Sequence, residues 1–175
     1  MRASVLQRLA RLRVPLGFVF GACVVLLARP TWRTIGAGAA VGVLGESIRI
    51  WAAGHLEKSR EVTRSGPYRY TRHPLYVGSS VMAAGVAVGA GSWAVAALVA
   101  LYMGSTISAA VRTEEAFLRG RFGDEYAAYA ERRAPEMARR FSLERAWRNK
   151  EYRALVGLIA AIGLLALKAA FWSSP

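Results

Sequence analysis

The sequence changes character at Arg72-His73-Pro74-Leu75-Tyr76-Val77-Gly78, where a charged loop meets an apolar segment of membrane length. Proline is favoured at the first position of a helix, because its missing N–H needs no partner there. Pro74 is therefore predicted to begin a helix. The free N–H groups and the dipole of that first turn favour a carboxylate or phosphate, with Arg72 and His73 beside it. The same seven residues also fit an ordinary membrane helix that Arg, His and Tyr anchor at the interface.

Composition independently indicates a membrane protein. The 175 residues are 54% hydrophobic and carry a net charge of +13, and long apolar runs alternate with arginine-rich runs. We predict an all-α, polytopic integral membrane helical bundle formed by one membrane-embedded domain over residues 1–175. About five transmembrane helices are expected, at residues 14–29, 34–54, 74–89, 93–111 and 155–172. The single cysteine, Cys23, excludes an internal disulfide and a zinc cluster.

The distribution of charge predicts the orientation of the spans. Residues 2–13, 55–72 and 112–153 hold 20 of the 24 Lys and Arg residues. The positive-inside rule then places the N-terminus and these segments in the cytoplasm and the C-terminus outside. The short uncharged connection at 89–92 makes the third and fourth spans antiparallel, so Glu114-Glu115 returns to the face that carries Arg72-His73-Pro74. We therefore expect an active site on the cytoplasmic side, with a cofactor region at 55–73 and 112–153.

The chain after Glu115 is amphipathic rather than spanning. Aromatic residues alternate with charged ones up to Arg133, and Asp124 after Gly123 is a good helix N-cap. We expect two short cytoplasmic amphipathic helices at the level of the lipid headgroups. Residues 134–153 are strongly basic and are interpreted as a solvated surface against anionic membrane lipid, so the positive charge requires no nucleic acid as a partner.

Two charged residues lie inside the second apolar segment. Glu46 and Arg49 are three residues apart, which places them on one face of a helix. Charges within a membrane span usually face the bundle interior and pair with each other. The pair is either a structural lock between helices or part of a substrate pocket, in which Arg49 orients an anionic acceptor and Glu46 holds Arg49 in place.

Two separated motifs resemble those of one membrane enzyme family. They are Ser65-Gly66-Pro67-Tyr68-Arg69-Tyr70-Thr71-Arg72-His73-Pro74-Leu75-Tyr76-Val77-Gly78, and Glu114-Glu115-Ala116-Phe117-Leu118 followed by Phe122-Gly123-Asp124-Glu125-Tyr126-Ala127-Ala128-Tyr129. In this order, with a membrane hairpin between them, they resemble the isoprenylcysteine carboxyl methyltransferase family. The wider group includes phospholipid methyltransferases and membrane sterol reductases. The resemblance covers about residues 40 to 133.

The resemblance implies S-adenosylmethionine as the cofactor and a lipophilic acceptor, a small molecule or a lipid, that enters from the membrane. It implies that the residues matching His73, Tyr76, Gly78, Glu114 and Glu115 lie at the cofactor site.

The residues themselves suit this cofactor, which presents a carboxylate, an ammonium and a sulfonium. The helix start at Pro74-Leu75 with Arg72 and His73 forms an anion cradle, and Glu114 or Glu115 is a partner for the ammonium. Tyr68 and Tyr76 are available to cover the adenosine.

The leading interpretation is therefore methyl transfer to a lipophilic acceptor, with a carboxylate as the expected methylated group. Three alternatives remain: an N-methyltransferase for phospholipids or other amines, an NADPH-dependent reductase of the sterol type, and a lipid-binding membrane protein without catalysis. No metal-ligand cluster, Ser-His-Asp set or phosphate-binding loop is evident in the sequence. The sequence identifies neither the acceptor nor the oligomeric state.

Overall fold

The structure is a computed structural model that describes residues 19–172. Helices account for most of this part, which contains no strand. After a helical segment at residues 19–27, the chain forms α2 (Trp32–Ala53), η1 (Gly66–Arg69), α3 (Pro74–Ala90), α4 (Trp93–Ala130), α5 (Leu143–Arg148) and α6 (Tyr152–Trp172).

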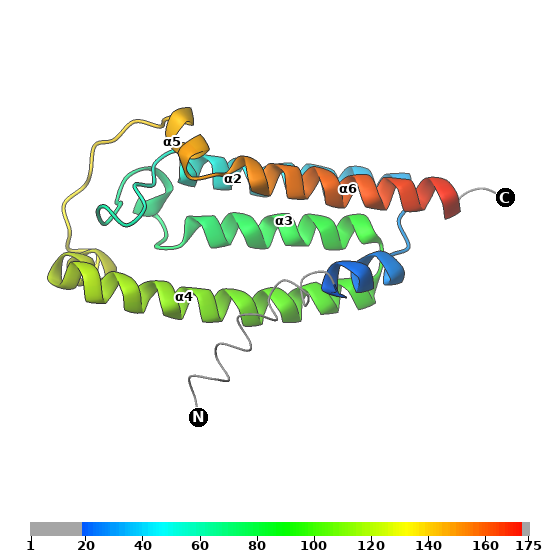
Figure 1. Cartoon of the computed structure of the whole chain (residues 1–175), viewed down its shortest axis with the longest axis horizontal. Coiled ribbons are helices and arrows are strands. Elements are labelled where there is room, and N and C mark those ends of the chain that lie inside the picture. The colour runs from blue at the N-terminus through cyan, green and yellow to red at the C-terminus, as the bar shows by residue number, and fades with distance from the viewer. Residues whose placement is uncertain (1–18, 173–175) are drawn as a thin grey trace, which may run out of the picture.

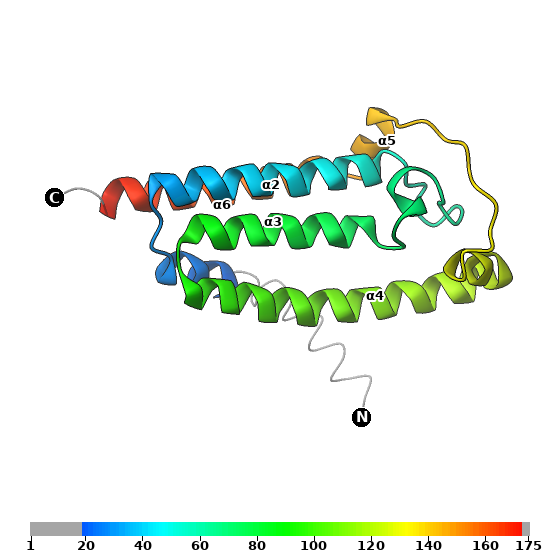
Figure 2. The same cartoon turned by 180° about the vertical axis from the view of Figure 1, so that it is seen from behind.

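The long helices lie lengthwise beside one another, with α2 and α6 on one side of α3 and α4 on the other (Figure 1). The view from behind shows the same order (Figure 2). The loop at residues 54–73, α5 and the end of α4 gather at one end of the bundle, and the turn between α3 and α4 lies at the opposite end (Figure 1). The polar connections that carry the predicted site thus share one end.

Three described helices are long and apolar enough to cross a membrane, namely α2, α4 and the Tyr152–Phe171 part of α6. The apolar helix α3 has 17 residues, which corresponds to about 25 Å. The expected span at 14–29 lies partly outside the described residues. The predicted helical bundle with helices of membrane length is therefore confirmed for residues 19–172, whereas the number of five spans is not.

Glycines allow α2 and α3 to pack backbone against backbone. A Cβ added to Gly85 on α3 would lie 2.5 Å from the backbone nitrogen of Gly42 on α2, and one added to Gly45 would lie 2.7 Å from the carbonyl oxygen of Gly78. Small residues bring membrane helices together in this way, because little apolar driving force exists between helices in lipid. The glycines of α2 therefore allow close approach to α3.

The turn between α3 and α4 forms the predicted antiparallel hairpin. α3 ends at Gly91, which has a left-handed backbone with φ of 59°. Glycine is suited to this position because it adopts positive φ without strain. A Cβ at Gly91 would also approach the carbonyl oxygen of Arg29 to 2.6 Å.

The fourth helix continues further than predicted. α4 runs from Trp93 through Glu114 and Glu115, and its first non-helical residue is Gly123, with φ of 46° and ψ of −120°. The prediction of two separate short helices after Glu115 is therefore wrong for the first of them, because Ala, Glu, Leu and Arg are strong helix formers and continue the span. Residues 124–130 form a second helical piece beyond this bend.

The basic segment is not simply a solvated surface. Arg139 forms two hydrogen bonds to Glu61, of 2.6 and 2.7 Å, and Arg145 forms one of 2.9 Å to Glu57. Both arginine side chains are less than one fifth exposed. The predicted solvated surface is wrong for these two residues, because carboxylates in the loop at 54–63 form ion pairs with them.

Candidate active site

A cavity of about 650 Å³ lies at the end of the bundle where the polar connections gather. Its walls come from the loop at residues 56–63, the start of α3, the middle and end of α4, and Arg49 of α2. Small-molecule pockets typically enclose roughly 300–1,000 Å³. The cavity is therefore large enough for a cofactor.

The two sequence motifs meet beside this cavity, although 42 residues separate His73 from Glu115. Nε2 of His73 lies 3.1 Å from Oε1 of Glu115, and Nη1 of Arg72 lies 3.0 Å from the same oxygen. A carboxylate only accepts hydrogen bonds, so Nε2 of His73 carries a hydrogen in this contact. Glu115 thus ties the loop before α3 to α4.

Most of the predicted site residues line the cavity. Eight of them do so: Arg49, Tyr68, Arg72, His73, Pro74, Leu75, Tyr76 and Glu114. The other three do not: Glu115 lies behind His73 and Arg72, Gly78 packs against α2, and Glu46 is buried within the helices. A Cβ at Gly78 would lie 2.5 Å from Cγ of Arg49, so this glycine leaves room for the arginine side chain.

The first turn of α3 offers fewer free donors than the sequence suggested. Pro74 has no N–H, and the N–H groups of Tyr76 and Val77 donate to the carbonyl oxygen of His73 at 3.0 and 3.1 Å. The backbone N–H of Leu75 remains as the donor of that turn. An anion bound here would therefore depend on the Arg72 and His73 side chains more than on the helix start.

Aromatic side chains enclose the cavity from two sides. Tyr68 is 8% exposed, and its carbonyl oxygen accepts a hydrogen bond of 2.8 Å from the hydroxyl of Tyr129. Burial, with a contribution from the Glu114 carboxylate, raises the pKa of Tyr68 well above its ordinary value, so the phenol stays neutral. Phe117, Tyr126 and Tyr129 of α4 also line the cavity. Two sequence signals covered these three residues: the amphipathic pattern after Glu115 and the second family motif, which contains them.

Arg49 reaches the cavity from within the bundle. Its Nε lies 2.5 Å from Oε1 of Glu151, and its Nη1 donates to the carbonyl oxygen of Leu75 at 3.3 Å and to the hydroxyl of Ser79. Glu46 is more distant, at 3.9 Å. The arginine that the sequence indicated lines the cavity, and its role there stays a prediction. Its partner Glu151 was missed because it lies 102 residues away in a basic segment.

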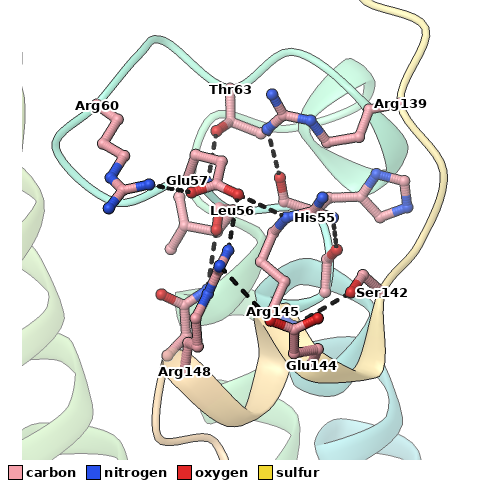
Figure 3. Close-up of polar contacts among 12 residues, drawn as sticks. His55, Leu56, Glu57, Arg60, Thr63, Arg139, Ser142, Glu144, Arg145 and Arg148 are labelled. Carbon is pink, nitrogen blue, oxygen red and sulfur yellow. Dashed lines mark hydrogen bonds and ion pairs between the residues drawn. The ribbon is translucent and has the colours of Figure 1, made fainter.

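One wall of the cavity is held by ion pairs from the basic segment (Figure 3). Glu57 accepts hydrogen bonds from Arg145 at 2.9 Å and Arg148 at 3.0 Å, and Arg60 lies 3.9 Å away. The hydrogen bond from Arg145 holds the pKa of Glu57 below its ordinary value. These contacts fix the loop that begins at His55.

His55 packs inside this loop rather than facing the cavity. The ring is 5% exposed, and its Nδ1 lies 3.1 Å from the hydroxyl of Ser65. Burial lowers the pKa of His55, and the neighbouring charges of Arg145, Arg139 and Arg69 lower it further. A neutral, hydrogen-bonded imidazole in this place supports the loop.

Comparisons with known proteins identify a family and several relatives. Residues 32–125, more than half of the chain, match the family described as phospholipid methyltransferase. The chain is 39% identical over 111 residues to the cobalt-zinc-cadmium resistance protein CzcN of Cupriavidus metallidurans, covering 60% of this chain and 50% of the relative. It is 37% identical over 111 residues to the nickel-cobalt-cadmium resistance protein NccN of Alcaligenes xylosoxydans xylosoxydans, covering 60% and 51%.

A third relative has the name of the family that the two sequence motifs resemble. Protein-S-isoprenylcysteine O-methyltransferase of Schizosaccharomyces pombe is 34% identical over 85 residues, covering 49% of this chain and 36% of the relative. The chain thus spans about half the length or less of the curated relatives it matches. No solved structure matches. The family match and this relative confirm the resemblance, and the chain belongs to the phospholipid methyltransferase family.

Proposed function

We propose that the protein transfers a methyl group from S-adenosylmethionine to a lipophilic acceptor that partitions into the membrane, with a carboxylate as the methylated group. The contact between His73 and Glu115 is the observation that carries this proposal. It joins the two motifs at a single cavity, on the end of the bundle where the basic segments gather. By the charge distribution, that end faces the cytoplasm.

The residues around the cavity fit the cofactor chemically. Arg72 and His73 are cationic or hydrogen-bonding partners for its carboxylate, and the Glu114 carboxylate is a partner for its ammonium. Nδ1 of His73 is buried without a hydrogen-bond partner among the described residues, so a polar atom is available to a ligand. When bound, S-adenosylmethionine supplies an electrophilic methyl group on a sulfonium.

The chain's own contribution is to align the reactants and exclude water. Tyr68, Tyr76 and Tyr129 surround the cavity with apolar rings, and the Tyr129 hydroxyl closes one side by its bond to the Tyr68 carbonyl. A transfer that dissipates charge gains from alignment in a dry site. Arg49 is the one cation of α2 that lines the cavity, and we assign to it the orientation of the acceptor's anionic end.

An amine acceptor is the second candidate, and one observation favours it. Two buried carboxylates, Glu46 and Glu151, lie within 3.9 Å of the single guanidinium of Arg49. The cluster therefore holds two carboxyl groups and one guanidinium, which suits a cationic or proton-donating headgroup. A lipid amine also agrees with the description of the family.

Equilibrium binding to the purified, detergent-solubilised protein tests the cofactor. We expect S-adenosylmethionine to bind and NADPH not to bind. Tyr76→Ala should weaken S-adenosylmethionine binding, whereas Tyr70→Ala is a matched control, because Tyr70 is 74% exposed and does not line the cavity. Binding of NADPH alone would favour a reductase. Binding of neither nucleotide would favour a lipid-binding protein without catalysis.

A further inference from the structure

The guanidinium of Arg49 on α2 is held by α3 and by the turn that leads into α6. The arginine itself belongs to α2, its Nη1 is bonded to Leu75 and Ser79 of α3, and its Nε is bonded to Glu151 immediately before α6. Its Nη2 makes no hydrogen bond to any other residue in the described part of the chain. That nitrogen is the donor left for a ligand in the cavity.

Glu151 is itself fixed in place. It is 6% exposed, its backbone N–H donates to the carbonyl oxygen of Ala146 at 3.2 Å, and its carbonyl oxygen accepts from Ala154 at 2.9 Å. Lys150, the residue before it, has a positive φ of 61°, which turns the chain sharply from α5 into α6. The carboxylate therefore presents a rigid partner to Arg49.

Glu46 is the competing partner and is less well placed. Its nearest oxygen lies 3.9 Å from Nε of Arg49, compared with 2.5 Å for Glu151. Both Glu46 oxygens are buried without a hydrogen-bond partner among the described residues. If the Glu151 carboxylate is lost, the Arg49 side chain can turn toward Glu46 and away from its present position, because an unpaired buried carboxylate attracts a nearby cation.

We propose that Glu151 is the positioning residue that keeps the Arg49 guanidinium directed at the cavity. This inference rests on the proposed function, in which Arg49 orients the acceptor. On this proposal the turn between α5 and α6 belongs to the active site. That turn lies outside the family match at residues 32–125. Acceptor geometry in this chain then depends on a residue that the matched family segment does not contain.

Chemical labelling tests the position of Arg49 without any acceptor. Phenylglyoxal modifies accessible guanidinium groups, and mass spectrometry of the solubilised full chain reports the labelled fraction of Arg49. We expect Glu151→Gln to lower Arg49 labelling at least fivefold, because the side chain turns from the cavity toward the buried Glu46, and the matched Glu46→Gln to change it less than twofold. Glu151→Asp, which keeps the charge on a shorter side chain, should lie between. If Glu151→Gln does not fold, Glu151→Asp still tests the inference, through Arg49 labelling no more than half that of the wild type.

A kinetic arm uses N-acetyl-S-farnesyl-L-cysteine as a lipophilic carboxylate probe. Glu151→Gln should lower kcat/KM for the probe at least tenfold while changing the Kd for S-adenosylmethionine less than twofold, and Glu151→Asp should restore part of the loss. If Glu151 were merely structural, its loss would change kcat/KM for the probe, the Kd for S-adenosylmethionine and the melting temperature together. Equal labelling of Arg49 in the two glutamine variants, or a larger change in Glu46→Gln, overturns the inference. Absence of S-adenosylmethionine binding by the wild type refutes the proposed function instead, and the labelling result remains decisive.

Discussion

Glu114 and Glu115 are adjacent, yet the structure gives them different surroundings, so their glutamine variants are expected to behave differently. Glu114 lines the cavity and lies 3.8 Å from Nδ1 of His73, whereas Glu115 lies behind the cavity wall, bonded to Arg72 and His73. We infer that Glu114 contacts the cofactor's ammonium directly. Glu115 acts through the two residues it holds.

The expected magnitudes follow from these surroundings. A hydrogen bond to a charged group contributes about 1.5–3 kcal/mol. The Glu114 side chain is 43% exposed, so water screens it and the lower end of that range applies, which corresponds to about tenfold in affinity. Glu115 is 20% exposed and has two partners at 3.0 and 3.1 Å. Its loss loosens the loop that forms the site, and we expect about tenfold weaker binding of any ligand there.

A pair of ligands separates the two roles. 5′-Methylthioadenosine carries the adenosine but lacks the amino-acid ammonium. In equilibrium dialysis, Glu114→Gln should weaken the binding of S-adenosylmethionine about tenfold and change the affinity for 5′-methylthioadenosine less than twofold. Glu115→Gln should weaken the binding of both ligands. Equal loss of both ligands in Glu114→Gln would refute direct contact with the ammonium. A loss confined to S-adenosylmethionine in Glu115→Gln would show that this carboxylate contacts the cofactor itself.

The remaining predictions concern topology, packing and pH. Reporter fusions after Ser92 and at the C-terminus should both report the exterior, and a cytoplasmic signal after Ser92 would contradict the proposed orientation. Gly85→Ala should lower stability by about 1–3 kcal/mol in chemical unfolding, because its Cβ meets α2 backbone, whereas Gly104→Ala, with open space around it, should not; equal effects would refute the packing argument. The pKa of Glu57 is lowered in the fold by its bond to Arg145, so its contribution to stability is present above the unfolded pKa and is lost as pH falls through the folded pKa. Below about pH 4.3, the melting temperature of Glu57→Gln should therefore fall less with pH than that of the wild type. Parallel plots of melting temperature against pH would contradict this.

Local signals predicted the elements that carry the site. Pro74 begins α3, and the glycine at 91 ends it, as their backbone preferences require. Because the short hairpin makes α3 and α4 antiparallel, Glu115 returns to the end of the bundle that holds His73. Where local signals were weak, the prediction failed. The sequence changes from apolar to amphipathic after Glu115, but α4 does not end there. A helix that passes from lipid into water keeps its backbone hydrogen bonds.

The basic segment could not be assigned from sequence because its partners are distant. Arg139 and Arg145 have the same local pattern as Arg140 and Lys150, yet the first two are paired with Glu61 and Glu57 while the latter two are exposed. A carboxylate about eighty residues away determines which arginine is structural, and no periodicity records that pairing. Arg140 and Lys150 are among the exposed cations of the segment, for which contact with anionic lipid stays a prediction, while Arg139 and Arg145 hold the cavity wall. Within one basic segment, therefore, the carboxylates that the fold brings near decide which arginines are buried in ion pairs and which stay exposed.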